Sequence, residues 1–184
     1  MTNLIAGMTV SLDGYAADAD GSAAALYPDL AALQDTSYMD ELITETGSVL
    51  MGRGAFDMAP DPDAFADSYE FQCPIFVLTH RPPPNPPREN DQLSFTFVSD
   101  GMQSAVAQAK KAAGSRSVQC IGGPGIIGQL LQADLLDELR IDIMPVMLGG
   151  GLRFLEAIGR RIELEKTTVS EVGQRTTIRL RPTR

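Results

Sequence analysis

A glycine turn between an apolar strand and an apolar helix restricts the fold of this chain more than any other feature. Residues 122–128, Gly-Gly-Pro-Gly-Ile-Ile-Gly, follow the short apolar run 118–121 and open a helical pattern of apolar residues. Such a turn lets the backbone approach a ligand closely, and it points unpaired helix N–H groups and the positive end of the helix dipole at that ligand. Because phosphate is the usual ligand there, the sequence predicts a phosphorylated cofactor or substrate.

Length and charge limit the classes of protein to which this chain can belong. The 184 residues fit one domain spanning 1–184, with enough apolar residues for a core. The net charge of −9 argues against nucleic acid as a partner, since nucleic-acid binding needs a basic face. No segment approaches the about 20 apolar residues of a membrane span. The first residues lack the pattern of a signal peptide, so we expect a cytoplasmic protein without a membrane partner.

The cysteines and the histidine give no sign of a metal site. Cys73 and Cys120 do not have metal-ligand spacing, and a domain of this size does not need a disulfide, so we expect two reduced thiols. His80 is the single histidine, which excludes a histidine-rich site. We therefore predict no bound metal.

Apolar runs and turn residues alternate along the chain in an α/β order. Residues 15–28, rich in Ala, Asp, Gly and Ser, predict a mobile loop. We expect strands at 4–10, 48–51, 74–79 (a central strand), 95–98, 118–121 and 139–144, and an antiparallel pair at 162–170 and 174–181. We expect one broken or two short helices over 29–45, a helix at about 102–113, and one that begins near 126. This order predicts a mainly parallel sheet with an antiparallel C-terminal edge.

Single residues mark several expected boundaries. Gly47 fits the C-terminus of the helix before it, and Gly114 fits the end of the helix at 102–113. Ser99 or Asp100 is expected to cap the start of that second helix.

Three predicted strands end in similar clusters of glycine, small polar or basic residues. These are Gly52-Arg53-Gly54, Thr79-His80-Arg81 and Gly122-Gly123-Pro124-Gly125. Ligands of open α/β sheets bind beyond the carboxyl ends of the strands, so the clusters converge if the strands are neighbours. Each cluster alone also fits an ordinary turn, and His80 alone fits a surface or capping residue. Together they predict a site for pyrophosphate and for a further phosphate, such as the 2′-phosphate of NADP.

Five segments recur in a familiar order: 8–14 (Met-Thr-Val-Ser-Leu-Asp-Gly), 49–53, 74–79, 121–124 and 145–151 (Pro-Val-Met-Leu-Gly-Gly-Gly). In this order they resemble the dihydrofolate reductase-like family, and within it the reductase domain of riboflavin biosynthesis (the RibD C-terminal type). The resemblance runs from about residue 4 to 181. It implies the three-layer fold of that family, with NADPH as hydride donor and a pterin or a pyrimidine sugar phosphate as substrate.

The resemblance also implies roles for particular residues. Phosphate contacts fall to Gly52, Arg53 and Gly54, and the 2′-phosphate to Thr79, His80 and Arg81. Gly122 and Gly123, often joined by a cis peptide in this family, would face the pyrophosphate. The remaining cofactor-binding residues so implied are Pro124, Gly125 and Ile126 beside the pyrophosphate, and Ala6, Gly7 and Met8 beside the nicotinamide. The loop from Asp13 to Gly21 would close over the cofactor.

The substrate side of the site is less defined. Asp13 matches the riboflavin-type Ser-Leu-Asp-Gly motif and is the candidate catalytic residue, although a plain turn aspartate fits as well. Asp35, Asp40 and Glu41 lie in the region where folate reductases carry a buried carboxylate. The chain has no Trp, so the proline-tryptophan element of true folate reductases is absent, and it has no zinc signature of a deaminase.

The sequence therefore predicts an NADPH-dependent reductase of a pterin- or pyrimidine-type small molecule, similar to 5-amino-6-(5-phosphoribosylamino)uracil reductase. Two alternatives remain open on the same fold. One is an enzyme that acts differently on a phosphorylated metabolite, and the other is a non-catalytic nucleotide-binding protein. The riboflavin-type relatives are usually dimers, so the resemblance implies a homodimer.

Overall fold

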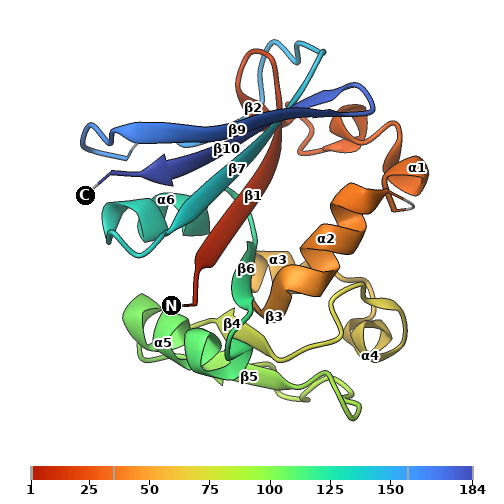
Figure 1. Cartoon of the computed structure of the whole chain (residues 1–184). Helices are drawn as coiled ribbons and strands as arrows, with labels where there is room; N and C mark the ends of the chain where they lie inside the picture. The colour runs from red at the N-terminus through yellow and green to blue at the C-terminus, as the bar shows by residue number, and fades with distance from the viewer. Residues whose placement is uncertain (1, 35, 157, 184) are drawn as a thin grey trace.

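The computed structural model describes residues 2–34, 36–156 and 158–183. Within them, eight strands form one sheet in the order β5-β4-β3-β6-β1-β7-β10-β9, and β2 and β8 form a second, small sheet (Figure 1). The strands are β1 Leu4–Ser11, β2 Tyr15–Ala17, β3 Thr46–Gly52, β4 Ile75–Leu78, β5 Phe95–Val98, β6 Ser117–Ile121, β7 Glu138–Met144, β8 Leu152–Arg153, β9 Leu164–Val172 and β10 Arg175–Pro182. The helices are η1 Ala24–Leu26, α1 Leu30–Gln34, α2 Ser37–Glu45, α3 Arg53–Asp57, η2 Pro62–Ala64, α4 Phe65–Ser68, α5 Met102–Ala113 and α6 Pro124–Gln132.

The main sheet is parallel from β5 to β7 and antiparallel at β10 and β9, as the sequence predicts. Strand β1 lies inside the sheet and pairs with β6 on one side and β7 on the other. Both neighbours come from the second half of the chain, so the first strand is held by residues far away in the sequence. The segment predicted as a central strand, β4, lies between β3 and the edge strand β5.

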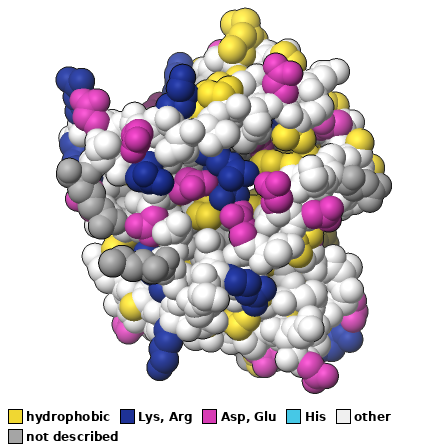
Figure 2. Space-filling view, viewed as in Figure 1, with side chains coloured by type: hydrophobic (Ala, Val, Ile, Leu, Met, Phe, Trp, Pro, Cys, Tyr) yellow, Lys and Arg dark blue, Asp and Glu magenta, His cyan; other side chains and the backbone are white. Residues whose placement is uncertain are grey.

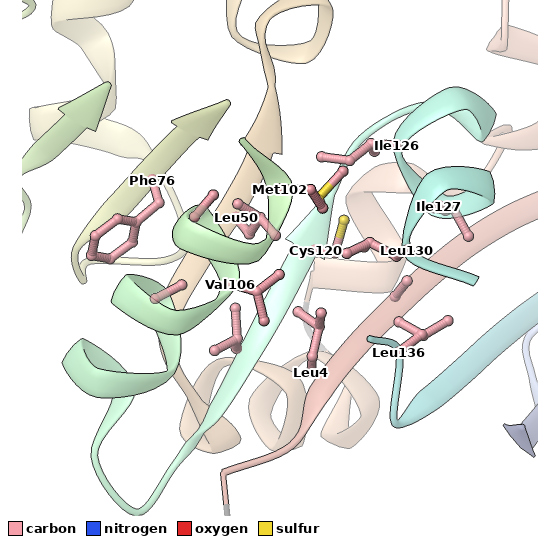
Figure 3. Close-up of a cluster of buried hydrophobic side chains, with 14 of the residues drawn as sticks. Leu4, Leu50, Phe76, Met102, Val106, Cys120, Ile126, Ile127, Leu130 and Leu136 are labelled. Atoms are coloured by element: carbon pink, nitrogen blue, oxygen red, sulfur yellow. The ribbon is translucent and has the colours of Figure 1, made fainter. Parts of the chain in front are cut away.

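Each face of the sheet carries its own hydrophobic core, which gives the three-layer arrangement. On one face, Met102 and Val106 of α5 and Ile127 and Leu130 of α6 pack against strand residues such as Leu50 (Figure 3). On the other face, Phe56 of α3 packs with Val49, Met51, Ile75 and Val77. Successive strand residues point to opposite faces, which is why Leu50 belongs to one core and its neighbours Val49 and Met51 to the other. Cys120 and Cys73 are buried in different cores.

Residues 15–28 differ from the loop that their composition predicts. They form β2, which pairs with β8, and the single turn η1. Ala16, Ala17 and Leu26 are buried, so these apolar side chains hold the segment against the sheet. These three apolar residues stand among polar ones, so the composition of the whole segment indicates a loop.

Two predicted boundaries are wrong. Gly47 does not end a helix; it lies in β3, and Thr46 caps α2. The N-cap of α5 is Gly101, at φ 112°, rather than Ser99 or Asp100, and no side chain caps it among the described residues. The Asp100 carboxylate instead accepts a hydrogen bond from Ser104 Oγ at 2.8 Å. Gly114 ends α5 in the left-handed region, as predicted.

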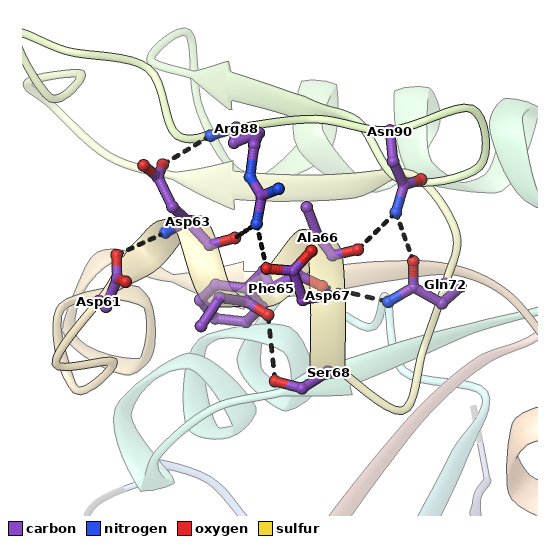
Figure 4. Close-up of polar contacts among 10 residues, drawn as sticks. Asp61, Asp63, Phe65, Ala66, Asp67, Ser68, Gln72, Arg88 and Asn90 are labelled. Atoms are coloured by element: carbon purple, nitrogen blue, oxygen red, sulfur yellow. Dashed lines mark hydrogen bonds and ion pairs between the residues drawn. The ribbon is translucent and has the colours of Figure 1, made fainter.

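The proline-rich segment 82–90, which follows β4, is fixed by polar contacts to α4 and η2 (Figure 4). The backbone N–H of Arg88 donates to Asp63 Oδ1 at 2.8 Å, and its guanidinium pairs with Asp67. Asn90 Nδ2 donates to the carbonyl of Ala66 at 2.7 Å and to Gln72 Oε1 at 2.8 Å. These contacts hold a segment that prolines exclude from helices and inner strands.

Gly47→Ala tests why a glycine stands inside β3. A Cβ at Gly47 would lie 2.5 Å from the carbonyl oxygen of Ala113 and 2.8 Å from its Cα, both backbone atoms. We expect a loss of about 2–3 kcal/mol in the free energy of unfolding, measured by denaturant titration, because β3 and the end of α5 must separate. Gly54→Ala is the control, since its Cβ would meet nothing within 4 Å. Equal stability of the two variants would contradict the close approach.

Candidate functional site

The three predicted clusters meet at one edge of the sheet. They follow β3, β4 and β6, which are neighbours in the order β4-β3-β6 and run parallel. Their carboxyl ends therefore point the same way, and the turns after them form one surface. The sequence could place each turn after a strand, but only the strand order brings the turns together.

A cavity of about 590 Å³ lies at this edge. It brings together seven of the predicted cofactor-binding residues, and its other lining residues come mainly from α5 and the turn before it. The predicted residues in its lining are Gly52, Arg53, Thr79, His80, Arg81, Gly125 and Ile126. Pro124 lies on the other side of α6, in a groove of about 270 Å³ that shares Gly125 and Gln129 with the cavity. Gly54 borders open space, because a Cβ added to it would meet nothing within 4 Å.

Helices α5 and α6 both begin at the cavity. Gly123 is the N-cap of α6 and Gly101 that of α5, and in the described residues neither has a side-chain cap. Their first backbone N–H groups are therefore left for solvent or for a ligand. A carboxylate or hydroxyl cap would occupy this position, so its absence at both helices favours an anion in the cavity.

Gly122 allows β6 to turn directly into α6. A Cβ at this position would lie 2.6 Å from Ile126 Cγ2, so a larger residue would require the Ile126 side chain to move. The described residues contain no cis peptide bond, so the Gly122–Gly123 bond is trans here, unlike the cis bond common in the family. Close packing of glycine against Ile126, rather than an unusual peptide, sets the turn.

Basic side chains line the opposite wall of the cavity. Arg53 is held by Asp57, with Nε to Oδ1 at 2.7 Å, and donates from Nη1 to the carbonyl of Arg81 at 2.5 Å. Thr79 is buried, and its hydroxyl accepts from the backbone N–H of Arg81 at 3.1 Å, which shapes the turn. The side chains of His80 and Arg81 are exposed and have no hydrogen-bond partner in the described part of the chain.

Strand β1 extends beyond the end of β6. The register pairs Leu4–Ala6 with Val118–Cys120, and β1 continues to Ser11. Ala6, predicted to face the nicotinamide, has no exposed surface, because its side chain lies in the core and its backbone belongs to the ladder. Gly7 and Met8, which follow it, are half-buried. The part of β1 that extends past β6 and pairs only with β7 thus begins at Gly7.

Asp13 connects the turn after β1 to the turn after β7. Its carboxylate accepts hydrogen bonds from Ser11 Oγ at 2.6 Å, from the backbone N–H of Leu148 at 3.1 Å and from that of Gly149 at 2.7 Å. The hydrogen bond from Ser11, followed by those from the two backbone groups, lowers the pKa of Asp13 to about 2. A carboxylate held in this way is suited to positioning the loops rather than to donating a proton.

The candidate carboxylates of the α2 region do not form a buried site. Asp40 and Glu41 are exposed on α2, and Asp35 lies outside the described residues. The buried carboxylate near α2 is Asp142, on β7, which is 7 % exposed. Thr177 Oγ1 donates to it at 2.6 Å and Tyr38 Oη at 3.2 Å. Burial and the charge of Asp142 raise the pKa of Tyr38 above its ordinary value, so the hydroxyl remains a donor.

Sequence reasoning missed Asp142 because it looked for the carboxylate on the helix. One signal was present: an aspartate alternates with Ile141 and Ile143 in a strand whose apolar residues face the core. The face that carries Asp142 also carries Arg140, which is 4 % exposed and pairs with Glu45 and Glu138. Acidic and basic side chains lie together between α2 and strands β7 and β10 (Figure 2). This face of β7 is therefore polar although it is buried.

No set of three or more metal-ligating His, Cys, Asp or Glu side chains occurs among the described residues. A search of the same residues for a helix long and apolar enough to cross a membrane also finds none.

Comparison with known proteins places the chain in a family. The model of the RibD C-terminal domain matches residues 2–178, nearly the whole chain. The chain therefore belongs to the RibD C-terminal domain family, as its motifs suggest. Two uncharacterized proteins of Bacillus subtilis strain 168 are similar in sequence. YwjB is 25% identical over 167 residues, which cover 91% of this chain and 90% of YwjB, and YyaP is 24% identical, covering 88% and 85%.

Solved structures share the fold. A protein of Shewanella sp. PV-4 assigned to riboflavin biosynthesis superposes with a TM-score of 0.78, at 24% identity and 100% coverage of both chains. Riboflavin biosynthesis reductase Rib7 of Saccharomyces cerevisiae gives a TM-score of 0.61 at 16% identity, covering 99% of this chain and 90% of Rib7. Dihydrofolate reductase of Enterococcus faecalis gives 0.61 at 17% identity, covering 99% and 97%. The predicted dihydrofolate reductase-like fold is thus confirmed.

Asp13→Asn tests the link between the two loops. Because its pKa is lowered from 3.8 to about 2, ionised Asp13 stabilises the fold above the ordinary pKa, and this contribution is lost as the pH falls toward 2. We expect the variant to be less stable than the unsubstituted protein at pH 7 and the difference to shrink between pH 4 and pH 2, followed by denaturant titration at each pH. Asp91→Asn, at an exposed position, is the control. A difference that does not change with pH would contradict this role.

Proposed function

We propose that the chain is an NADPH-dependent reductase of a pterin- or pyrimidine-type small molecule, similar to 5-amino-6-(5-phosphoribosylamino)uracil reductase, and that residues 1–184 form one domain. The observation that carries the proposal is the cavity at the ends of β3, β4 and β6. It joins two helix N-termini without side-chain caps to the basic side chains of Arg53 and Arg81 in a protein of net charge −9. Similar structures include a riboflavin biosynthesis reductase and a dihydrofolate reductase complexed with NADP(H).

The residues of the cavity fit a phosphorylated dinucleotide. Gly122 keeps the start of α6 close to the strand end, where the backbone N–H groups of Gly125 and Ile126 suit a pyrophosphate. Arg53 is held in place by Asp57 and by the carbonyl of Arg81. His80 and Arg81 provide exposed donors without partners in the described residues, which suits a further phosphate.

The protein would contribute orientation and exclusion of water. Bound NADPH supplies the hydride. Gly7 and Met8, where β1 extends past β6, would hold the nicotinamide end at the centre of the sheet. The Asp13 carboxylate would hold the loops after β1 and β7 together over that end.

Asp142 is the carboxylate that we propose for holding the substrate. The register places it beside Thr9, two residues from Gly7, on the face covered by α2. A carboxylate offers about four lone-pair positions, so the bonds from Thr177 and Tyr38 leave room for an N–H donor of a heterocycle. Burial among paired groups would strengthen that bond relative to water.

Arg81→Ala tests the cofactor and its 2′-phosphate. We expect stabilisation of the unsubstituted protein by NADPH far beyond that by NADH in thermal-shift titrations. The variant should lose about tenfold or more in NADPH affinity, or about 1.4 kcal/mol, with NADH binding nearly unchanged. Arg161→Ala, at an exposed arginine paired with Glu163, is the control.

The titration, together with an assay of turnover, also distinguishes the alternative functions. Equal losses for both dinucleotides would remove the 2′-phosphate assignment. Nucleotide binding without preference for NADPH would favour an enzyme acting on a phosphorylated metabolite. NADPH binding without turnover of any pterin or flavin precursor would favour a non-catalytic binding protein.

Asp142→Asn tests the substrate side. The variant preserves the size of the side chain and one acceptor oxygen, so we expect it to fold and to bind NADPH normally. We expect kcat/KM with 5-amino-6-(5-phosphoribosylamino)uracil to fall by about 100-fold, because a neutral amide holds the ring less well and passes on no proton. Asp40→Asn, exposed on α2, is the matched control. Unchanged kcat/KM in Asp142→Asn would exclude Asp142 from the site.

The homodimer stays a prediction. Strand β9 at the free edge of the sheet is exposed at every position but its last, and Val169 on it is 51 % exposed. A second copy covering this edge is the arrangement we expect, since unprotected edge strands favour further pairing.

A further inference from the structure

The side-chain amide of Gln119 is buried without a hydrogen bond. Gln119 lies on β6 and is 3 % exposed. Its Oε1 is fully buried with no hydrogen-bond partner among the described residues, and its Nε2 is the end of the amide that approaches Gly7. Buried amides in proteins are nearly always hydrogen-bonded, so this one needs an explanation.

The residues paired with Gln119 on the two neighbouring strands are apolar. In the register, Gln119 stands between Val49 of β3 and Ile5 of β1, which are 0 % and 2 % exposed. An apolar side chain would suit such a position, and burying an unpaired amide there costs stability. A glutamine at this position is therefore a local cost to the fold without a partner in the fold.

Gly7 provides the opening to this amide. Gln119 Nε2 lies 3.6 Å from the point where a Cβ of Gly7 would stand, and Gly7 is half-buried, so solvent reaches it. The backbone of Gly7 is not in the left-handed region, so its conformation does not demand glycine. What glycine provides here is space between the surface and the amide. Gly7 is also the first residue of β1 beyond its pairing with β6, and it pairs with Arg140 of β7.

We propose that Gln119 is a specificity-determining residue that pairs with an amide edge of a ligand bound over Gly7. An amide presents a donor and an acceptor side by side, and its complement is another amide, either a carboxamide or the lactam of a heterocycle. This inference rests on the proposed function, which supplies both sources: the carboxamide of the nicotinamide and a lactam of a pyrimidine-type substrate.

Gln119→Met tests the proposal first without any ligand. Methionine has a similar volume and no polar group to leave unpaired. We expect the Tm to rise by about 2–4 °C, because the unpaired amide is removed. Gln108→Met, at an exposed position on α5, should not raise it. A fall in Tm for Gln119→Met would show that the amide is satisfied in the fold and would overturn the proposal.

Ligand binding distinguishes the two sources. The probes are NADPH, its 3-acetylpyridine analogue, which has a methyl group in place of the carboxamide nitrogen, and 5,6-diaminouracil added to the NADPH-saturated protein. If Gln119 holds the nicotinamide, the unsubstituted protein binds NADPH about tenfold tighter than the analogue and Gln119→Met loses this preference. If it holds the substrate, Gln119→Met binds NADPH normally and loses about tenfold in diaminouracil affinity.

Gly7→Ala closes the opening and leaves the amide in place. The added methyl group would make ordinary contacts, at 3.6 Å to Gln119 Nε2 and 4.0 Å to the carbonyl of Arg140, so we expect a folded protein. Its binding should change in the same direction as that of Gln119→Met, without the rise in Tm.

Two failures can be told apart. If the unsubstituted protein binds neither NADPH nor its 3-acetylpyridine analogue, the proposed function fails and this inference fails with it. If the unsubstituted protein binds NADPH, and Gln119→Met binds all three probes as the unsubstituted protein does, the role of Gln119 is overturned while the proposed function stands.

Discussion

The parallel pairing of β4, β3 and β6 is the constraint on which the candidate site depends. Main-chain hydrogen bonds between these strands fix the positions of the turns that follow them, and those turns carry the glycines and the basic residues. The pairing is stabilised from both sides, because Leu50 packs into one core and Val49 and Met51 into the other. A shift of one residue in β3 would exchange the two cores, so burial on both faces also fixes the position of Gly52 and Arg53 at the cavity.

The charges of the molecule are arranged in two different ways. At the cavity, Arg81 has an exposed guanidinium without a partner in the described residues, and Arg53 is held by one carboxylate. On the buried face of β7, Arg140 is fully matched by Glu45 and Glu138. Paired charges of the second kind hold the sheet and α2 in one arrangement, whereas the guanidinium of Arg81 remains available to an anion. An acidic protein can therefore have a site for an anion.

Local patterns predicted much of the fold and several of the turn residues that line the cavity. The glycine turn after β6, the helix that ends at Gly114 and the C-terminal hairpin are each encoded within a few residues. The errors have another origin. Gly47 is a glycine because the backbone of Ala113 lies against it. Asp142 is paired by Tyr38 and Thr177, which lie far from it in the sequence. Contacts between distant segments decided these positions, and a single sequence does not display them.

The place of β1 in the sheet has a consequence for how the chain is made. It is synthesised well before its partners, because the residues it pairs with begin at Val118 and Glu138. The apolar side chains of β1 lack their packing partners until β6 and β7 have been synthesised. The hydrogen bonds from Leu148 and Gly149 to Asp13 form later still. Because non-local strand pairing is slow, β1 is exposed to aggregation and to capture by chaperones until these later strands are available.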